Sequence, residues 1–405
     1  MDKLVVVGQG YVGLPISMAA AKSGYKVIGF DIDSEKVRQL NSGKSHIEDV
    51  TDQELKDLIS GGNYTASNDP TDLANCEIAI IAVPTPLDSN RKPDLSYLIS
   101  AAEVLGTSLL KPSLIINEST SYPGTLREII KPTVEKFSPK KIDHKYAISP
   151  ERVDPGNSNW SIKNTPRLFA GLTPEATKLT HHFYSRFCQT LVETSSPEIA
   201  EAAKLFENTF RQVNIALVNE LALITRSLNL NVHEVIAAAA TKPYGFMEFK
   251  PGLGVGGHCI PVDPSYLAHV SEKNGIEPRF INLANQVNLE MPSKVVARIK
   301  KDNGIDIKNK KILIVGMSYK ANVSDVRESP SIQLLNLLRK QCDHVFWLDP
   351  EVSELDGEKS YSGEEFDFDI AVIAISHDSI NFDGPKLKIP YILDCTGKLA
   401  GVNLL

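Results

Sequence analysis

Long hydrophobic runs are missing from this sequence of 405 residues. The longest apolar segments, such as residues 78–83 and 370–375, have the length of a strand. They fall well short of the about 20 residues that a membrane-spanning helix needs. The first residues, Met1-Asp2-Lys3, lead directly into a strand-like segment and show no signal-peptide pattern. We therefore expect a cytoplasmic protein that has no membrane partner.

Clustered cysteines and histidines are also missing. The five cysteines are scattered and form no CxxC pair, and the histidines form no cluster with metal-ligand spacing. We therefore expect reduced thiols and no metal site. An excess of positive charge is absent as well, because the formal net charge is -7. This balance argues against nucleic acid as a partner, although a local basic pocket for a nucleotide remains possible.

The composition, with 42% hydrophobic and 23% charged residues, is typical of a globular protein. The length of the chain predicts two or three domains. Strand-like and helix-like segments alternate at both ends of the chain, which favours the α/β class with parallel sheets.

A dinucleotide-binding pattern occupies the first residues. An apolar strand at 4–7 is followed by Gly8-Gln-Gly10-Tyr-Val-Gly13, a helix at about 15–23, a strand at 25–30 and Asp31. Gly8 permits the tight turn, and Gly10 lets a pyrophosphate approach the helix N-terminus. Asp31 would bind ribose hydroxyls and favour NAD over NADP. Alternatively, Asp31 caps the helix that begins near Ser34.

Polar residues follow three further strands of this region. Thr85 follows the strand at 78–83, and Thr120 follows the strand at 114–117. Because ligands gather at the carboxyl ends of parallel strands, both are candidates for the nicotinamide end of the cofactor, or they complete local turns. Glu151 and Arg152 follow another strand and either face a substrate or pair with each other.

A long helix is predicted over about 196–228, with Ser196 as its N-cap. Glu201 would lie near the positive end of its dipole. Lys204, Asn208 and Arg211 are spaced i, i+4 and i+7, so they share one face. This face is either a solvated surface or the polar wall of a pocket. A helix of this length could also carry a dimer interface.

The stretch from Pro251 to Asp263 combines four glycines with Cys259. Glycines allow a backbone to approach a ligand closely, and a cysteine after them can be presented as a nucleophile. The alternative is a glycine-rich surface turn beside an inert cysteine. Helices are expected next, at about 265–274 and 281–301.

A second α/β pattern follows, with strands at 311–315 and 345–348, the latter ending at Asp349. Only one glycine, Gly316, stands at its first turn, so we expect no second dinucleotide there. Lys320 and Arg327 lie in the next loop, and two basic residues near a strand end suit phosphates. An ordinary charged loop is the alternative.

Taken together, these residues resemble nucleotide-sugar 6-dehydrogenases of the UDP-glucose/GDP-mannose dehydrogenase family. The resemblance covers essentially the whole chain. The matching motifs are the glycine turn with Asp31, Pro84-Thr-Pro86, Ser119-Thr120 with Pro123-Gly124, Pro150-Glu151, Lys204 with Asn208, Gly256-Gly-His-Cys259 with Asp263, and Lys320 with Asp325-Val-Arg-Glu-Ser-Pro330.

The resemblance implies an α/β fold with two Rossmann-like, doubly wound parallel-sheet domains joined by a central helical domain with one long helix. The implied domains are an NAD-binding domain at 1–193, a helical dimerisation and catalytic domain at 194–302, and a UDP-sugar-binding domain at 303–405. A homodimer through the central domain is implied as well.

The resemblance also implies the roles of individual residues in a four-electron oxidation of a sugar C6 hydroxyl to a carboxylate. Cys259 would form a thiohemiacetal and then a thioester. Lys204 and Asn208 would bind the C6 oxygen, Asp263 and Thr120 would position a water, and Glu151 would be the base for hydrolysis. The implied NAD-binding residues are Gly8, Gly10, Tyr11, Val12, Gly13, Asp31, Lys36, Thr85, Thr120 and Arg327. The implied UDP-sugar-binding residues are Glu151, Arg152, Lys204, Asn208, Arg211, Gly254, Gly256 and Lys320.

The sugar is indicated by His258. Where the UDP-glucose and GDP-mannose branches have Gly-Gly-Ser-Cys, this chain has Gly-Gly-His-Cys, which resembles the UDP-N-acetylhexosamine branch, as does Arg211 in Phe210-Arg-Gln-Val-Asn. Thr241-Lys-Pro-Tyr-Gly-Phe246 resembles UDP-N-acetylglucosamine 6-dehydrogenases that supply surface polysaccharides. UDP-N-acetylmannosamine and UDP-glucose remain alternatives, as does a catalytically silent NAD-binding homologue.

Overall fold

The computed structural model describes residues 2–47, 49–139, 141–152, 159–363, 367–380 and 389–405. It divides the chain into two compact units. Unit 1 comprises Met1–Glu207 and Ser265–Asn274, and unit 2 comprises Asn208–Pro264 and Gly275–Leu405. The predicted division into three domains stays a prediction.

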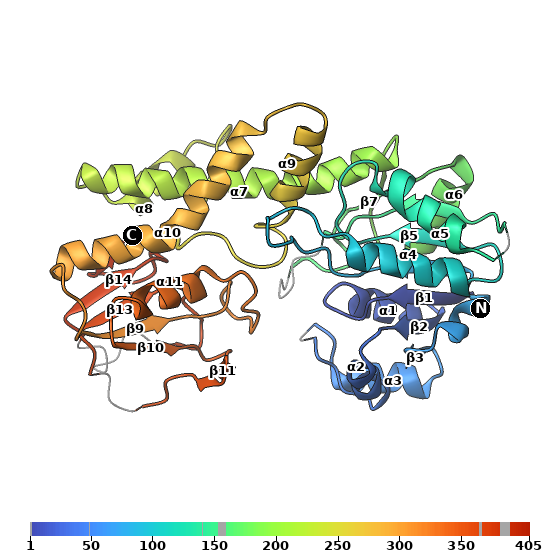
Figure 1. The fold of residues 1–405 in the computed structure, drawn as a ribbon, viewed down its shortest axis with the longest axis horizontal. Coiled ribbons are helices and arrows are strands. Elements are labelled where there is room, and N and C mark those ends of the chain that lie inside the picture. The colour runs from blue at the N-terminus through green and yellow to red at the C-terminus, as the bar shows by residue number, and fades with distance from the viewer. Residues whose placement is uncertain (1, 48, 140, 153–158, 364–366, 381–388) are drawn as a thin grey trace. The chain divides into compact units, whose positions relative to one another are not determined.

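Unit 1 is built on an eight-stranded sheet of order β3-β2-β1-β4-β5-β6-β7-β8 (Figure 1). Its neighbours pair in parallel except β6 and β7, which are antiparallel. The strands are β1 (Lys3–Val7), β2 (Lys26–Phe30), β3 (Tyr64–Ser67), β4 (Ile78–Ile81), β5 (Leu114–Asn117), β6 (Lys145–Ile148), β7 (Arg167–Gly171) and β8 (Leu191–Glu193). The helices are α1 (Gly13–Lys22), α2 (Ser34–Asn41), α3 (Asp52–Ser60), η1 (Pro70–Asn75), α4 (Ser96–Ser108), η2 (Leu126–Ile130, a π-helical turn), α5 (Lys131–Phe137) and α6 (Pro174–Tyr184).

Alternate side chains of β1 serve two different cores, because successive residues of a strand point to opposite faces. Leu4 and Val6 belong to the apolar cluster that contains α1, α2, α3 and α6 side chains. Val5 and Val7 belong to the cluster that contains α4 and α5 side chains. The sheet is therefore covered on both faces, as parallel sheets require.

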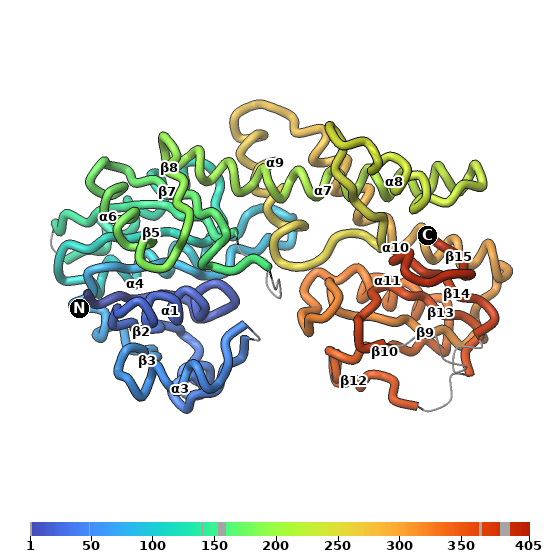
Figure 2. Tube along the Cα trace, turned by 180° about the vertical axis from the view of Figure 1, so that it is seen from behind, coloured from blue at the N-terminus to red at the C-terminus, as the bar shows by residue number. Residues whose placement is uncertain are grey.

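Unit 2 contains a parallel five-stranded sheet of order β10-β9-β13-β14-β15. Figure 2 shows its strands from behind, with the carboxyl terminus next to β15. The strands are β9 (Lys311–Val315), β10 (His344–Leu348), β13 (Ile370–Ile373), β14 (Tyr391–Asp394) and β15 (Asn403–Leu404), with a separate hairpin of β11 (Glu354–Leu355) and β12 (Glu358–Lys359). The helices are α8 (Val232–Ala240), α10 (Arg279–Asn303) and α11 (Pro330–Arg339).

Two helices run from one unit into the other along the chain: α7 (Pro197–Ser227) and α9 (Asp263–Lys273). The predicted long helix is therefore confirmed, and Ser196 Oγ accepts a hydrogen bond from Ile199 N at 3.4 Å, as its predicted role of N-cap requires. The predicted fold class, with two Rossmann-like parallel sheets and a central helical region, is also confirmed.

Candidate active site

The predicted dinucleotide turn follows β1, and its three glycines meet different surroundings. Gly8 has a φ of 91°, and a Cβ added to it would lie 2.4 Å from the carbonyl oxygen of Ala82. A Cβ on Gly13 would lie 1.7 Å from the carbonyl oxygen of Gly8. A Cβ on Gly10 would meet no atom within 4 Å. Gly8 and Gly13 are thus required by the turn itself, whereas Gly10 borders open space at the start of α1, which suits a pyrophosphate.

Asp31 lies at the carboxyl end of β2 and is buried. Its Oδ2 accepts hydrogen bonds from Gln9 N and from Lys36 Nζ, both at 2.9 Å. The N-cap of α2 is Asp33, whose carboxylate accepts from the backbone N–H groups at the start of that helix. The alternative interpretation of Asp31 as the helix cap is therefore wrong. An acid held against the glycine turn, with Lys36 beside it, fits the ribose of a dinucleotide.

Gln9 supports this turn, a role that no local sequence pattern indicates. The side chain is fully buried: its Nε2 donates to Val6 O at 2.9 Å, and its Oε1 accepts from Tyr64 Oη at 3.0 Å. A Cβ on Gly29 of β2 would lie 2.5 Å from Gln9 Oε1. Gln9 thus joins the turn to β3, and Gly29 makes room for it. Tyr11 and Val12, predicted to contact the cofactor, are half-buried at the start of α1.

Thr85 and Thr120 are half-buried in the loops after β4 and β5. Between these loops, Ser119 Oγ accepts from Val83 N and donates to Val83 O, both at 2.9 Å. Because Ser119 ties the two loops together, Thr120 has a defined backbone position at the carboxyl edge of the sheet. Their predicted contacts with the cofactor stay predictions.

Glu201 of α7 accepts hydrogen bonds from the loop that follows β5. Its Oε1 accepts from Ser121 Oγ at 3.0 Å and from Leu126 N at 3.2 Å, and its Oε2 accepts from Gly124 N at 2.7 Å. Burial raises the pKa of Glu201 to about 7, although these hydrogen bonds act in the lowering direction. The sequence alone indicates only an acid at a helix start. Its actual partners lie about 75 residues away in the sequence, where a helical pattern cannot reveal them.

Glu118, which directly precedes Ser119 in the chain, belongs to a buried ion pair. Glu118 at the end of β5 and Arg167 at the start of β7 are both almost fully buried, with Arg167 Nη1 3.0 Å from Glu118 Oε2. Tyr184 of α6 donates its hydroxyl to Glu118 and stacks under the guanidinium, whose centre lies 4.7 Å from the ring centroid. No local sequence pattern predicts this group, because Glu118, Arg167 and Tyr184 come from three separate elements.

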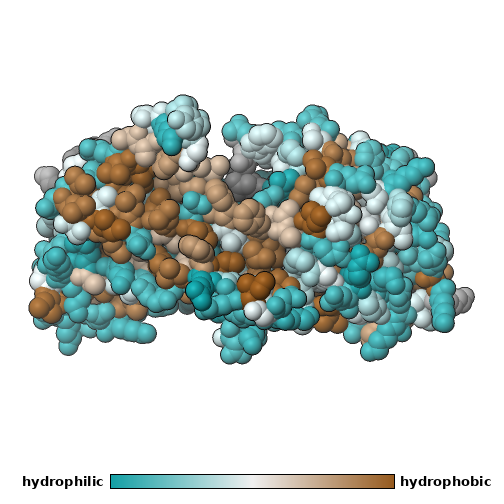
Figure 3. All heavy atoms as spheres, turned by 90° about the horizontal axis from the view of Figure 1, so that it is seen from above, coloured by the Kyte–Doolittle hydropathy of each residue, from teal (hydrophilic) through white to brown (hydrophobic). Residues whose placement is uncertain are grey.

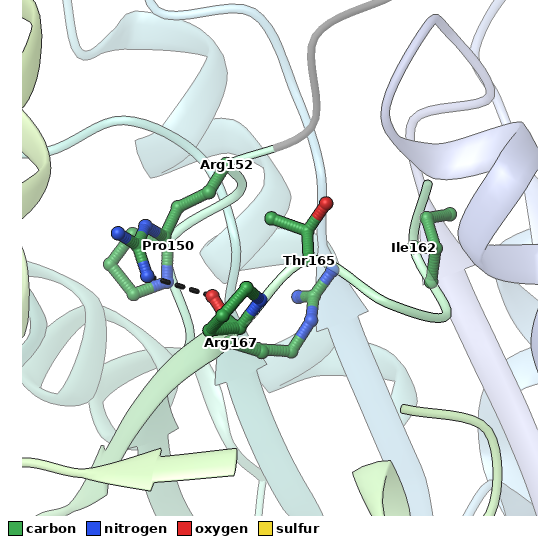
Figure 4. Close-up of a pocket in the computed structure, with 6 residues that line it drawn as sticks. Pro150, Arg152, Ile162, Thr165 and Arg167 are labelled. Atoms are coloured by element: carbon green, nitrogen blue, oxygen red, sulfur yellow. Dashed lines mark hydrogen bonds between the residues drawn. The ribbon is translucent and has the colours of Figure 1, made fainter. Parts of the chain in front are cut away.

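Arg152 is predicted to bind the substrate, and its guanidinium has partners within unit 1. Its Nη2 lies 2.7 Å from Glu207 Oε1, and its Nη1 donates to Pro166 O at 2.7 Å. Figure 4 shows the latter bond in a small pocket lined by Pro150, Arg152, Ile162, Thr165, Pro166 and Arg167. Glu151 is half-buried next to it. The predicted roles of Glu151 and Arg152 stay predictions.

Lys204 and Asn208 stand one turn apart on α7, and Arg211 follows on the same face. Lys204 is buried, Asn208 is half-buried and Arg211 is exposed. The Asn208 amide donates from Nδ2 to Asp263 Oδ2 at 2.6 Å. A buried lysine on this face disfavours the alternative of a simple solvated surface.

Cys259 precedes α9 by a single turn. Its carbonyl oxygen accepts from Asp263 N at 2.8 Å, and its Sγ lies 3.2 Å from His258 Nδ1. Cys259 is half-buried, whereas the four other cysteines are buried. Burial raises the pKa of Cys76 to about 11 and that of Cys395 to about 12, which makes those thiols poor nucleophiles. Cys259 is thus the thiol best placed to react.

The glycines before Cys259 approach the protein's own atoms. A Cβ on Gly254 would lie 2.7 Å from Asn288 O, and one on Gly257, whose φ is 85°, would lie 2.8 Å from the Tyr319 ring. Gly256 is equally close to Tyr319. These glycines therefore allow the loop to pack on α10 and on the β9–α11 loop. Their predicted contacts with the sugar stay a prediction.

Buried amides fasten this loop to α7 and α10. Gly252 N donates to Asn219 Oδ1 at 2.8 Å, and Asn219 Nδ2 donates to Asn288 Oδ1 at 3.0 Å. Unpaired amides would be costly to bury, so this chain of bonds fixes the path of the backbone.

The β9–α11 loop contains the two predicted phosphate-binding cations. Arg327 Nη2 pairs with Asp325 Oδ2 at 2.5 Å, while Lys320 is half-buried and its backbone oxygen accepts from Ser318 Oγ at 2.7 Å. Their predicted contacts with cofactor and substrate stay predictions.

Among the described residues, no helix combines the length and apolarity that crossing a membrane requires. The same residues hold no group of three or more His, Cys, Asp and Glu side chains arranged to bind a metal ion.

Comparisons with known proteins cover almost the whole chain. Residues 2–188 match the NAD binding domain of the UDP-glucose/GDP-mannose dehydrogenase family, residues 198–290 its central domain, and residues 313–399 its UDP binding domain. A UDP-N-acetyl-D-glucosamine 6-dehydrogenase of Pseudomonas aeruginosa is 36% identical, with 89% of this chain and 85% of the relative covered.

A second curated relative, a UDP-N-acetyl-D-mannosamine dehydrogenase of Pyrococcus horikoshii, is 34% identical over 97% of this chain and 94% of its own length. Among solved structures, the UDP-D-ManNAc dehydrogenase from Pyrococcus horikoshii has a TM-score of 0.90 and 32% identity, with 99% of this chain and 98% of that chain covered.

Proposed function

Because this chain belongs to the UDP-glucose/GDP-mannose dehydrogenase family and is an NAD-dependent nucleotide-sugar dehydrogenase, we propose that it oxidises the C6 hydroxyl of UDP-N-acetylglucosamine to the uronic acid. The single observation that carries this proposal is the grouping of Cys259, Asp263 and Asn208. The Asn208 amide binds the Asp263 carboxylate at 2.6 Å, and the Asp263 N–H binds the Cys259 carbonyl at 2.8 Å.

The glycine turn and Asp31 fit NAD, since Gly10 borders open space and the acid is held at the adjacent strand end. NAD, when bound, would accept a hydride from C6 in each of two successive oxidations. The protein's part is to position the sugar, to provide a nucleophile between the two oxidations and to move protons.

Cys259 is the nucleophile of the proposed reaction. Its sulfur bonds to the carbonyl carbon of the aldehyde from the first oxidation and gives a thiohemiacetal, which still bears a hydrogen on that carbon. The second oxidation gives a thioester, which water cleaves to the acid and the thiol. A thiol suits both steps because it adds readily to an aldehyde and is a good leaving group.

Lys204 and Asn208 are proposed to stabilise negative charge on the C6 oxygen, as a cation and an amide donor on one face of α7. Asp263, with its carboxylate fixed by Asn208, and Thr120 are proposed to hold a water that carries protons. Glu151 is proposed to take a proton from the water that attacks the thioester.

The UDP part of the substrate is assigned to residues 313–399, which match the family's UDP binding domain. Within them, Lys320 is the proposed phosphate contact. We further propose that the product supplies a surface polysaccharide and that the reaction takes place in the cytoplasm.

The configuration at C2 of the sugar is tested by offering purified enzyme UDP-GlcNAc, UDP-ManNAc, UDP-GalNAc and UDP-glucose side by side and following NADH formation. The proposal predicts the highest kcat/KM for UDP-GlcNAc. A preference for UDP-ManNAc would agree instead with the solved relative of TM-score 0.90. No oxidation of any of the four would contradict the proposed function.

A second copy of the chain is the proposed partner. Along α7, Ile199, Phe206, Phe210, Leu217 and Ile224 are exposed, and their separations of seven or four residues place them on one face. Figure 3 looks onto the side on which α7 lies in Figure 1 and shows apolar side chains, in brown, gathered there. Exposed apolar side chains in one continuous row mark an interaction site.

Light scattering of the eluting protein tests this proposal. The unchanged chain should elute as a dimer, and Leu217→Glu should shift it to the monomer. Leu110→Glu is the matched control, because Leu110 is exposed but lies outside α7. A monomeric unchanged chain would contradict the proposed dimer.

A further inference from the structure

His258 is the residue that distinguishes this chain's Gly-Gly-His-Cys motif, and its imidazole contacts the neighbouring thiol. His258 Nδ1 and Cys259 Sγ are 3.2 Å apart, within hydrogen-bond distance for sulfur, and both residues are half-buried. A nitrogen at this distance can accept the thiol proton. The contact therefore joins a base to the proposed nucleophile.

The backbone before His258 is fixed by the β9–α11 loop. Gly257 N donates to Arg327 O at 2.9 Å, and a Cβ on Gly257 would meet the Tyr319 ring at 2.8 Å. Tyr319 N in turn donates to Asp325 O at 2.9 Å. His258 thus follows a residue that is bonded directly to the segment containing Asp325.

A negative charge, that of Asp325, interacts with His258. Burial would raise the pKa of Asp325, but hydrogen bonds from Arg327 and the positive charges of Arg327 and His258 hold it below its usual range. Asp325 is therefore ionised near neutral pH and can stabilise an imidazolium at His258. Arg327 opposes this effect in part. Asp263, the other acid close to Cys259 in the chain, has its carboxylate bound by Asn208.

We propose, building on the proposed function, that His258 is a further catalytic residue whose Nδ1 removes the Sγ–H proton of Cys259 as the sulfur bonds to the substrate's carbonyl carbon. In this step the sulfur–carbon bond forms, the carbonyl π electrons move to oxygen, and the proton moves to the imidazole. When water later cleaves the thioester, the carbon–sulfur bond breaks with its electron pair on sulfur, and the imidazolium returns the proton. His258 is unchanged over the cycle.

This arrangement resembles other thiol enzymes, in which an adjacent base or imidazolium generates a thiolate at neutral pH. Asp325 would act as the charge-stabilising third member. A serine at position 258 would offer no comparable base.

The proposal is tested by the rate at which iodoacetamide alkylates the full-length protein between pH 5 and pH 10, without substrate. Peptide mass spectrometry assigns the label to Cys259, and Cys259→Ser is the blank. In the unchanged protein the rate should reach half its plateau at about pH 7 or below, against about 8.5 for a free thiol. His258→Gln should move this midpoint upward by at least about one pH unit, which makes alkylation at pH 7 about fivefold slower when the midpoint of the unchanged protein is about pH 7.

Asp325→Asn keeps the nitrogen–sulfur contact and should move the midpoint upward by a smaller amount. If His258→Gln does not fold, the alkylation midpoints of Asp325→Asn and of the unchanged protein test the proposal. A midpoint near 8.5 in the unchanged protein would overturn the proposal, and so would a low midpoint that neither variant shifts.

Alkylation requires no UDP-sugar, so the two proposals fail separately. A low midpoint that shifts in His258→Gln, combined with no oxidation of any UDP-sugar, would contradict the proposed function and leave the thiol–imidazole pair intact. Oxidation of UDP-GlcNAc, combined with a midpoint that neither variant shifts, would contradict the thiol–imidazole pair and leave the proposed function intact.

Discussion

β1 and β9 are the first strands of the two sheets along the chain, and each is followed by a glycine in the left-handed region: Gly8 with a φ of 91° and Gly316 with a φ of 89°. Each glycine N–H donates to the last residue of the neighbouring strand, Gly8 to Phe30 O and Gly316 to Leu348 O, both at 2.8 Å. An acid follows each of these neighbouring strands. The same backbone turn therefore occurs once in each unit.

The acids have different surroundings. Asp31 in unit 1 bonds the turn through Gln9 N, and its other strong partner is Lys36, a side chain that is 28% exposed. Asp349 in unit 2 accepts from Met317 N at 2.6 Å and lies 3.1 Å from Nε2 of His377. The side chains of Asp349 and His377 are both fully buried.

The tautomer of His377 follows from its second nitrogen. Asn322 N donates to His377 Nδ1 at 3.0 Å, so Nε2 carries the hydrogen that faces Asp349. The position of Gly10 is taken in unit 2 by Ser318, which is buried. Strand, glycine and acid thus specify a turn, whereas the residues after the glycine and the partners of the acid decide whether a nucleotide can use it.

Of the differences expected between the two units, the largest is in the free energy of unfolding. Asp349→Ala leaves the buried His377 imidazole and two turn amides without their acceptor, so it should lower the free energy of unfolding by about 3–5 kcal/mol. Urea denaturation followed by circular dichroism measures this loss. Asp31→Ala is the matched control and should cost much less, because water can reach Lys36. Equal losses would remove the distinction between a structural acid and a ligand-binding acid.

The pH dependence of stability should differ between two buried acids of the two units. The pKa of Glu201 is raised by burial to about 7, so its contribution to stability is present below its unfolded pKa and is lost as pH rises from about 4.5 to about 7. Hydrogen bonds from His377, Ser318 and Met317 lower the pKa of Asp349 despite its burial, so its contribution is lost as pH falls toward acid.

Denaturation from below pH 3.8, the unperturbed pKa of an aspartate, up to pH 7.5 tests both signs. Glu201→Gln should flatten the fall in stability between about pH 4.5 and pH 7, while Glu198→Gln, on the same helix but paired with Arg127 at the surface, should not. The loss of unfolding free energy caused by Asp349→Asn should become smaller at the acid end of this pH range. An unchanged slope in Glu201→Gln would show that this carboxyl titrates normally.

The affinity for NAD should depend on Asp31, the acid of unit 1. We expect Asp31→Ala to raise KM for NAD by about tenfold or more, since a charge-assisted hydrogen bond contributes about 1.5–3 kcal/mol. Initial rates at saturating UDP-sugar measure the change. An unchanged KM in Asp31→Ala would contradict the ribose role.

Gly10→Ala should have the smallest effect on folding. The added Cβ meets no atom within 4 Å, so the free energy of unfolding should change by less than about 0.5 kcal/mol. KM for NAD should nevertheless rise, because the methyl group occupies the space assigned to the pyrophosphate. Gly8→Ala is the contrasting variant and should destabilise the protein, since its Cβ would lie 2.4 Å from Ala82 O. An unaltered KM in Gly10→Ala would place the pyrophosphate elsewhere.

The sequence predicted features that depend on local spacing. The glycine turn before α1, the helix α7 and the strands β5 and β9 all follow from short patterns of glycine or of apolar residues. The shared face of Lys204 and Asn208 followed from helix geometry in the same way.

Long-range contacts were not predictable. The Asn208–Asp263 bond and the Glu201–Gly124 bond join residues about 55 and 77 positions apart, and no periodicity encodes such pairs. The antiparallel strand β7 was not predicted either. Asp33 rather than Asp31 proved to cap α2, since a two-residue difference in cap position is below what sequence resolves.

The NADH formed per UDP-GlcNAc consumed at completion tests the proposed four-electron oxidation through Cys259. We predict two NADH and one uronic acid for the unchanged enzyme, and a halt at the aldehyde level in Cys259→Ser. One NADH per sugar in the unchanged enzyme, or full production of the acid by Cys259→Ser, would contradict the account.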